Sequence, residues 1–472
     1  MSTARRIVKN LLSLTVAEAA NKGIAFITVA YLVRIILPEG SGKIAWANSI
    51  IIYFTFFASF SFDVYGSREI AKSQDEVERA SVVNNIFSIK LFISILLYVI
   101  LAIFVIFLPK SSEVKAILLI SGVNIFSMAL LLNWFFQGIE KMEIMALRQL
   151  LTGSINLAGV MLIVKTNNDV VMAVTVTTTT MLINSLWILT YYLKKYNRIK
   201  LSVNLQEWKK VIRSSMPISM SLLLSIIYNY MTVQFLGFSR TYHETGIYDA
   251  AFKILAVSTI PVAIIQNAFF PLLSRSETIE SRIKVFRFYY LMNVIVGTII
   301  AFGIFTYSEY AIRLSFGNKF HESVAVLRLL MISAMIMYFN STFSQSLLAW
   351  KHEKRVFFAM LAGGITCLLL NIILVTKMGP EGAAITSIST EFIVMIGLSG
   401  GLVKIIKSIN FVTPLLMIGF SAPVCYGGYK LMQLGVHPMI CGGLSLGGYI
   451  ALILIFRIVR IGELRTILRK QT

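Results

Sequence analysis

Residues 84–108 read NNIFSIKLFISILLYVILAIFVIFL, and Lys90 is the one charged residue in this run. About 20 apolar residues in a helix cross the roughly 30 Å hydrocarbon core of a bilayer, so the segment is long enough to span a membrane. The whole chain has the same character, because 57% of its 472 residues are hydrophobic and 14% are charged. Soluble proteins carry about 25% charged residues. The sequence therefore predicts a protein that folds in lipid.

Apolar segments of this kind recur along the chain and predict an all-α integral membrane protein with about 14 transmembrane helices. Strands with free edges would leave backbone groups without hydrogen-bond partners in lipid, so every span is expected to be a helix. The expected spans are 11–36, 43–64, 84–108, 115–136, 145–165, 169–193, 214–237, 247–270, 286–308, 324–349, 355–376, 381–403, 410–432 and 437–458.

The longest polar stretch, 194–213, separates the first twelve spans into six and six. We predict an N-terminal six-helix lobe over 1–193, a cytoplasmic linker over 194–213 and a C-terminal six-helix lobe over 214–403. Residues 404–472 are expected to form two additional helices and a basic cytoplasmic tail. Faint echoes between the halves suggest a parallel repeat, in which two bundles enclose a central cavity. Gly443 and Gly447 predict a face for close helix packing, against the second bundle or a partner.

Basic residues are distributed in a way that predicts the orientation of the chain. With the N-terminus inside, most of the 43 Lys and Arg residues fall in the cytoplasmic segments, as the positive-inside rule requires. Both termini are then cytoplasmic. The net charge of +21 is explained by topology and by attraction to anionic membrane lipids, so nucleic acid is not an expected partner.

Several kinds of chemistry are not expected from this sequence. There is no G-x-x-x-x-G-K-[ST] motif for ATP hydrolysis, and neither His243-Glu244 nor His352-Glu353 is completed to H-E-x-x-H. Cys367, Cys425 and Cys441 lie in apolar stretches without metal-ligand spacing. We expect no catalytic residue, no metal, no cofactor and no enzymatic activity.

Charged residues inside the spans need a reason, because each costs at least about 2.5 kcal/mol at the membrane centre. Glu18 and Lys22 are i, i+4 neighbours beside Asn21, and Asp249 and Lys253 repeat this spacing before a kink expected at Pro261. Each pair either neutralises itself or lines a cavity. Asp63 lies at an inner helix end, and Glu391 must find a partner on another helix or stay protonated. Arg34, Lys90 and Arg328 are one or two turns from a membrane face, where snorkelling to the surface is expected.

Four short motifs resemble those of one known family. They are Arg34-Ile-Ile-Leu-Pro38-Glu-Gly-Ser-Gly42, similar to R-x-x-L-G-P-E-x-F/Y-G, and Asn133-Trp-Phe-Phe-Gln137-Gly-Ile-Glu140, similar to W-F-F-Q-G-x-E. The others are Gly379-Pro380-Glu-Gly-Ala-Ala384, similar to G-P-x-G-A-A, and Phe269-Phe-Pro271-Leu-Leu-Ser274, similar to a P-x-x-S helix exit. In order and spacing they resemble the polysaccharide repeat-unit (O-antigen type) flippases of the multidrug/oligosaccharidyl-lipid/polysaccharide exporter superfamily.

The resemblance implies a V-shaped arrangement of two lobes in a bacterial cytoplasmic (inner) membrane. It also implies translocation of undecaprenyl-pyrophosphate-linked oligosaccharide by alternating access, because basic side chains in a wet cavity offset the desolvation of a diphosphate. Tyr228, Tyr230 and Tyr248 are expected to offer aromatic faces to sugars. The expected substrate-binding residues are Lys22, Lys253, Asn21, Arg34, Arg68 and Lys90. The expected ion-coupling residues, for H⁺ or Na⁺, are Glu18, Asp63, Asp249 and Glu391.

Other functions stay open at this point. An ion-coupled multidrug antiporter and a peptidoglycan-precursor (lipid II) flippase share the expected fold. A membrane glycosyltransferase or polymerase is less favoured, because no outer loop is long enough to carry a catalytic site. Polysaccharide polymerase or other assembly proteins are candidate partners of a repeat-unit flippase.

Overall fold

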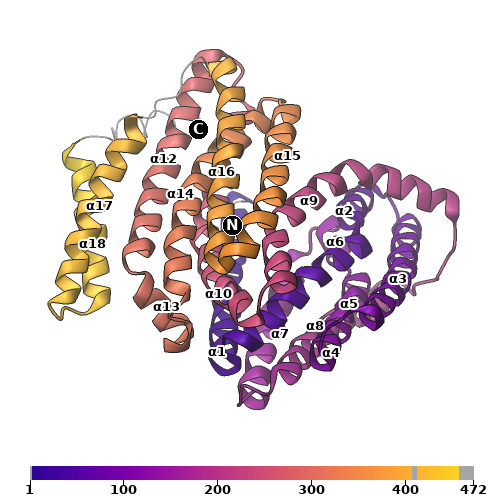
Figure 1. The fold of residues 1–472 in the computed structure, drawn as a ribbon. Coiled ribbons are helices and arrows are strands. Elements are labelled where there is room, and N and C mark those ends of the chain that lie inside the picture. The colour runs from indigo at the N-terminus through magenta and orange to yellow at the C-terminus, as the bar shows by residue number, and fades with distance from the viewer. Residues whose placement is uncertain (1–2, 407–411, 457–472) are drawn as a thin grey trace. The chain divides into compact units, whose positions relative to one another are not determined.

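The computed structural model describes residues 3–406 and 412–456, and every element in these two ranges is a helix (Figure 1). Side chains are described from Ala20 onwards, except those of Ser221, of residues 412–415 and of Ile418. The side chain of Glu18 and the predicted basic tail beyond Phe456 therefore lie outside the description. Eleven helical segments of the described chain are long and apolar enough to span a membrane. The protein is a multi-pass integral membrane protein.

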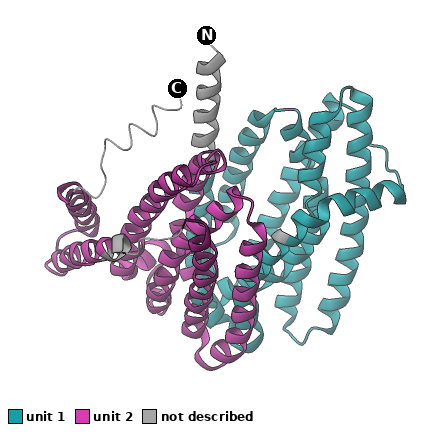
Figure 2. Ribbon diagram, turned by 90° about the horizontal axis from the view of Figure 1, so that it is seen from above, with its two compact units in different colours: residues 1–249 teal, residues 250–472 magenta. Residues whose placement is uncertain are grey.

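Two compact units divide the chain between Asp249 and Ala250 (Figure 2). The first unit contains α9, which packs against α1, α2 and α3, whereas the predicted boundary placed this helix in the second lobe. Its helices are α1 (Thr3–Ser59), α2 (Phe62–Lys72), α3 (Glu76–Phe107), α4 (Ser112–Gly122), α5 (Asn124–Leu130), α6 (Asn133–Gly138), α7 (Met142–Ile163), α8 (Val170–Lys195), α9 (Leu205–Ser239) and the start of α10 (Tyr242–Ser258).

The second unit begins within α10. Pro261 is in the first turn of the next helix, and α10 ends at Ser258, so the break expected near this proline is confirmed. The further helices are α11 (Ile260–Ser274), α12 (Ile279–Thr306), α13 (Ser308–Phe316), η1 (Asn318–Phe320), α14 (Ser323–Ala349), α15 (Glu353–Leu370), η2 (Asn371–Val375), α16 (Thr376–Ile406), α17 (Val412–Gln433) and α18 (Pro438–Ile455).

Two segments are long enough to cross the membrane twice, Ala20–Lys72 and Glu353–Ile406. A straight helix of 53 residues would be about 80 Å long at 1.5 Å per residue, far more than the membrane core. Each is broken before a proline, at Leu37 before Pro38 and at Gly379 before Pro380. Ala20–Lys72 also contains the boundary between α1 and α2, at Phe60 and Ser61. These breaks explain how eleven segments accommodate the predicted number of spans, since α17 supplies one more helix of 22 residues.

The chain reverses direction at each break. Before Leu37, Tyr31 donates a hydrogen bond to the Val164 carbonyl beyond α7, and after it Gly40 meets Val170 at the start of α8. In the second segment, Arg355 Nη1 donates to the Gly401 carbonyl at 2.6 Å. Each segment therefore contains a helical hairpin, with a single residue of non-helical φ and ψ at its turn.

The Asn133–Gly138 motif has a structural place in the first unit. Trp134, Phe135 and Phe136 are all buried, and the Phe135 ring meets the edge of Tyr192 with centroids 4.8 Å apart. Asn133 accepts a 2.7 Å hydrogen bond from Arg148. The Arg148 side chain is buried inside the unit, with 2% of its surface exposed.

The polar linker is held against α3. The Lys200 amide donates to Asn84 Oδ1 at 2.9 Å, and the Ser202 amide donates to Ser88 Oγ at 3.0 Å. Asn204 then caps α9, because its side chain accepts from the amides at the second and third positions after it. We call residues 200–204 the strap.

The last two helices pack within the second unit. Tyr449 of α18 is buried and shares a 2.5 Å hydrogen bond with Thr298 of α12. The glycines predicted to allow close packing, Gly443 and Gly447, meet no neighbour within 4 Å, so they do not pack against the second bundle, and their packing against a partner stays a prediction. The close approach occurs at Gly428, where an added Cβ would overlap Ser445 and the Tyr307 hydroxyl.

Candidate functional site

A buried ion pair joins α2 to α3. Lys90 Nζ lies 2.7 Å from Asp63 Oδ1, with 1% of the lysine side chain and 43% of the aspartate side chain exposed. Ser59 Oγ lies 3.4 Å from the other carboxylate oxygen. The prediction that Lys90 snorkels to the surface is wrong, because α2 folds beside it and supplies an anionic partner. An ammonium removed from solvent needs such a partner.

This pair brings together one residue predicted to bind substrate and one predicted to couple ions. Its carboxylate side remains open while its ammonium is enclosed. The Asp63 carboxylate is therefore the accessible part of the pair, and the Lys90 ammonium is the enclosed part. The arrangement suits an exchange of the anion that neutralises Lys90.

The other predicted polar residues of the first two helices are less buried than Lys90. Lys22, Arg34 and Arg68 are exposed, and Asn21 is half-buried. Asn21 faces α7, where its Oδ1 would be 2.9 Å from a Cβ added at Gly153. Of the three tyrosines expected to face sugars, Tyr248 is buried with 2% of its surface exposed, whereas Tyr228 and Tyr230 are half-buried.

Within the first unit, the second half of α1 crosses the start of α10 at two glycines. A Cβ added at Gly42 would overlap the Tyr242 carbonyl oxygen, and one added at Gly246 would overlap the Pro38 carbonyl oxygen. Only glycine permits such an approach of two backbones. Beside them, Ser41 Oγ donates to Asp249 Oδ2 at 3.4 Å, and Asp249 is 9% exposed. We call this contact the glycine seam.

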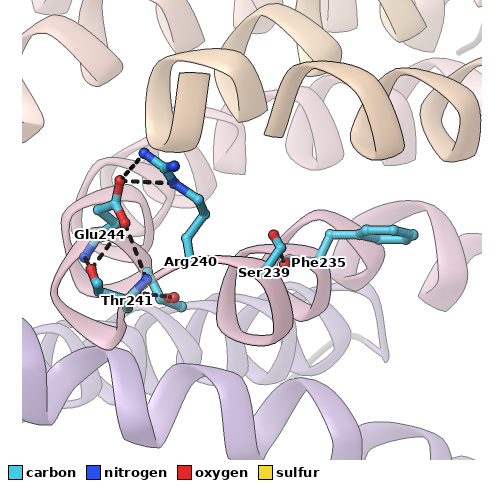
Figure 3. Close-up of polar contacts among 6 residues, drawn as sticks. Phe235, Ser239, Arg240, Thr241 and Glu244 are labelled. Atoms are coloured by element: carbon cyan, nitrogen blue, oxygen red, sulfur yellow. Dashed lines mark hydrogen bonds and ion pairs between the residues drawn. The ribbon is translucent and has the colours of Figure 1, made fainter. Parts of the chain in front are cut away.

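The turn between α9 and α10 fixes one side of the seam (Figure 3). Arg240 donates two hydrogen bonds to Glu244 Oε1, at 3.1 Å from Nε and 2.7 Å from Nη2. Thr241 and Glu244 form a capping box, in which the Glu244 amide donates to Thr241 Oγ1 and Glu244 Oε2 accepts from the Thr241 amide. Ser239 donates to the Phe235 carbonyl and closes the last turn of α9.

Lys110, between α3 and α4, reaches the same turn. Its Nζ lies 5.3 Å from the centre of the Trp46 ring, 5.1 Å from Tyr242 and 6.0 Å from Phe238. It also donates to the Gly237 carbonyl at 2.9 Å. Removal from water lowers the pKa of Lys110, while the ring faces and the carbonyl stabilise its cationic form. We call this group the lysine cage.

Sequence reasoning missed the lysine cage. Phe238 and Tyr242 flank the turn between α9 and α10, but Trp46 on α1 and Lys110 lie far from them in the chain. The one available signal was the run of aromatic residues around Phe238 and Tyr242 after a long apolar helix. That pattern alone does not indicate which cation they surround.

In the second unit, Glu391 of α16 has a partner on another helix, as its depth required. Asn340 of α14 donates to Glu391 Oε2 at 2.6 Å and to the Glu391 carbonyl at 2.9 Å. Lys253 on α10 is half-buried. Arg328 donates to Ser308 Oγ at 2.9 Å rather than extending freely into solvent. No cluster of three or more metal-ligating side chains occurs among the described residues of either unit.

The fold is shared with solved structures of membrane transporters. It is similar to the structure of the lipid II flippase MurJ in an inward closed conformation, with a TM-score of 0.77, 14% identity, and coverage of 94% of this chain and 99% of that one. It is also similar to an inward-facing MATE family multidrug resistance transporter of the MOP superfamily, with a TM-score of 0.65, 15% identity, and coverage of 83% and 94%.

The sequence comparison then gives the family. Residues 7–277 match the model of the polysaccharide biosynthesis protein family, and the chain belongs to this family. Two proteins provisionally named O-antigen transporters are related to it. The one from Shigella dysenteriae is 25% identical over 82% of this chain and 98% of its own length, and the one from Escherichia coli K12 is 23% identical over 82% and 94%. The family predicted from the four motifs is confirmed.

Proposed function

We propose that this protein is a flippase, which moves undecaprenyl-pyrophosphate-linked oligosaccharide repeat units across a bacterial cytoplasmic membrane by alternating access. The products would be used for a surface polysaccharide. Membership of the polysaccharide biosynthesis family and the names of its two curated relatives support this substrate class. Both termini are proposed to be cytoplasmic, because that orientation puts most basic residues inside.

The observation that carries the proposal is the enclosed Lys90 ammonium with its half-exposed partner Asp63. A diphosphate offers the same kind of anionic oxygen as a carboxylate and forms strong charge-assisted hydrogen bonds to lysine. Protonation of Asp63 removes its negative charge and so favours the exchange of partners. The exchange would couple proton uptake to binding of the diphosphate.

The remaining predicted residues complete the proposal. Lys22, Asn21, Arg34, Arg68 and Lys253 are assigned to the path of the anionic head group, and Glu18, Asp249 and Glu391 to ion coupling. Asp249 is of particular interest because it accepts a hydrogen bond at the glycine seam. Protonation of Asp249 would weaken that bond, because a neutral carboxyl oxygen is a poorer acceptor than a carboxylate, and so would loosen the contact between α1 and α10.

We expect Lys90→Met to abolish transport while the protein still folds. Methionine fills a buried site of similar length without a charge, and 43% of the remaining Asp63 side chain is exposed. Transport is expected to fall at least tenfold, measured as surface polysaccharide in a repeat-unit flippase-null strain at equal protein level. Lys165→Met, at an exposed loop position, is the control and should transport normally.

The opposite variant should separate folding from transport. Asp63→Ala leaves Lys90 buried without this anion, which is expected to cost about 3 kcal/mol of stability and to lower the thermal midpoint in detergent. Normal polysaccharide from Lys90→Met would refute the exchange mechanism. Rescue of a lipid II flippase-depleted strain, or efflux of a cationic dye, without rescue of the repeat-unit flippase-null strain would instead assign the protein to those functions.

A further inference from the structure

A separate cavity of about 520 Å³ lies in the first unit, lined by the second half of α2, the start of α3 and the start of α9. This volume is in the range of small-molecule sites, roughly 300–1,000 Å³. The strap forms one of its walls, because Asn204 lines it and Ser202 donates to another lining residue, Asn85, at 3.0 Å. We call this cavity the strap pocket. The Lys90–Asp63 pair does not line it.

The walls of the strap pocket are rich in hydrogen-bonding groups of both kinds. They carry three carboxylates, two ammonium groups, two amides and three hydroxyls, from Glu69, Glu78, Glu207, Lys72, Lys210, Asn85, Asn204, Ser73, Ser81 and Tyr65. Two of the carboxylates are paired with neighbouring lysines, Glu69 with Lys72 at 2.9 Å and Glu207 with Lys210 at 4.0 Å.

The bottom of the pocket is apolar. Ile86 and Val211, which line it, belong to the buried core of the unit together with Trp134. The pocket thus combines an apolar surface with a ring of donors and acceptors.

The balance of charge decides between ligand classes. Three carboxylates against two ammonium groups repel a diphosphate, so the strap pocket is not a second site for the anionic head group. A drug cation would compete with the lysines and the backbone amide that already engage these carboxylates. A neutral polyhydroxyl compound fits best, because its hydroxyls need donors and acceptors side by side and its C–H faces need an apolar surface.

We infer that the strap pocket binds the glycan of the lipid-linked substrate on the side where loading occurs. The inference rests on the proposed function for the identity of the glycan, and on the predicted cytoplasmic location of 194–213 for the side of the membrane. The diphosphate is held by basic residues of the spans, and the sugars are held outside the hydrocarbon core. A glycan in the pocket contacts α2, α3 and the strap together.

The direct test is binding of the free, phosphate-free repeat-unit oligosaccharide to the purified full-length protein in nanodiscs. Trp208 is a suitable reporter, because it follows Glu207 in the chain and packs on Phe92 with ring centroids 5.6 Å apart. We expect a saturable change in tryptophan fluorescence, and we expect this change to disappear in Trp208→Phe. No saturable binding by calorimetry or fluorescence would overturn the inference.

Glu207→Gln and Glu69→Gln keep the shape of the side chains and remove the charged acceptors. Each is expected to weaken oligosaccharide binding at least fivefold. Glu143→Gln, exposed in the first turn of α7, is the matched control and should bind as the wild type does.

A transport comparison separates this inference from the proposed function. In reconstituted vesicles, Glu207→Gln should flip the full repeat unit at least threefold more slowly but leave a lipid diphosphate with one sugar unaffected. If Glu207→Gln slowed the flipping of both substrates equally, or slowed neither, the glycan site would be overturned. Flipping by the wild type would still uphold the proposed function. Failure of the wild type to flip either substrate, with oligosaccharide binding intact, would refute the flippase proposal alone.

Discussion

Two turns of the molecule share the sequence Pro-Glu-Gly but differ in the residue before it. The first is Leu37-Pro38-Glu39-Gly40 in α1, and the second is Gly379-Pro380-Glu381-Gly382 at the start of α16. Both residues before proline have positive φ, with φ 62° and ψ 176° at Leu37 and φ 59° and ψ −132° at Gly379. Both reverse a pair of membrane helices. Gly379 is suited to this backbone conformation, and Leu37 is not.

The difference lies in what each turn contacts. Gly382 is pressed against the Leu374 carbonyl within the hairpin of the second unit, so this turn is fixed by packing alone. The first turn meets the glycine seam, where the Pro38 carbonyl touches Gly246. A leucine in a region that only glycine adopts easily costs about 1–3 kcal/mol and persists only where its surroundings enforce it. We infer that the first turn is held by the seam and would relax when the seam opens.

The largest effect is expected from Gly382→Ala. An added Cβ overlaps a backbone carbonyl, which cannot move aside as a side chain can, so a loss of about 3 kcal/mol is expected. Thermal unfolding in detergent measures it. Gly364→Ala on α15, where an added Cβ meets nothing within 4 Å, is the control and should unfold no earlier than the wild type. Equal midpoints for the two variants would show that the second turn is not packed as described.

Gly42→Ala should act on conformation more than on stability. The glycine seam can separate to admit the methyl group, so we expect a loss of less than about 1.5 kcal/mol of stability. We also expect the contact between α1 and α10 to open. A cysteine at the buried position Ser49, in a chain lacking Cys367, Cys425 and Cys441, should react at least fivefold faster with a membrane-impermeant maleimide. An unchanged rate would mean that the glycine seam does not close this side of the unit.

Lys110→Met should also raise the rate of labelling at Ser49, but by less than Gly42→Ala does. It removes a cation enclosed by three rings and one carbonyl hydrogen bond, contacts worth about 1–2 kcal/mol together. Labelling at Ser49 is expected to rise two- to threefold. Lys115→Met, which loses only a hydrogen bond to the Ile106 carbonyl in the same region, serves as the comparison and should leave labelling unchanged.

The smallest effect is expected from Leu37→Gly. It relieves the strained backbone but gives up some leucine packing and increases the entropy of the unfolded chain, so stability should change by less than about 1 kcal/mol. Gly379→Ala, at the equivalent place, should lose about 1–2 kcal/mol because alanine there acquires the strain. Similar losses for both would remove the contrast between the two turns.

The membrane spans and both turns could be predicted from sequence, because apolar length and a proline–glycine pair are local signals. The family could also be predicted, since its motifs lie at turns and in the buried Trp134 cluster. Lys90 was misplaced because its depth along α3 does not reveal that α2 folds beside it with Asp63. Glu391 clearly needed a partner, but identifying Asn340 requires knowing which faces of α14 and α16 meet. The lysine cage and the strap pocket are each formed by three segments that are separate in the chain, and no local sequence pattern predicts which segments come into contact.

The hairpins also bear on how the chain enters the bilayer during synthesis. Neither Leu37-Pro38 nor Gly379-Pro380 is followed by a long hydrophilic loop. Each pair of spans therefore has only a short turn to move through the lipid after the first span is in place, with Glu39 and Lys43 in the first turn and Lys377 and Glu381 in the second. A pair of this kind can leave the translocation channel as a single folded unit. The nascent protein would then gain two crossings in one step at each end of its twelve-helix region, and the orientation of both spans would be decided together.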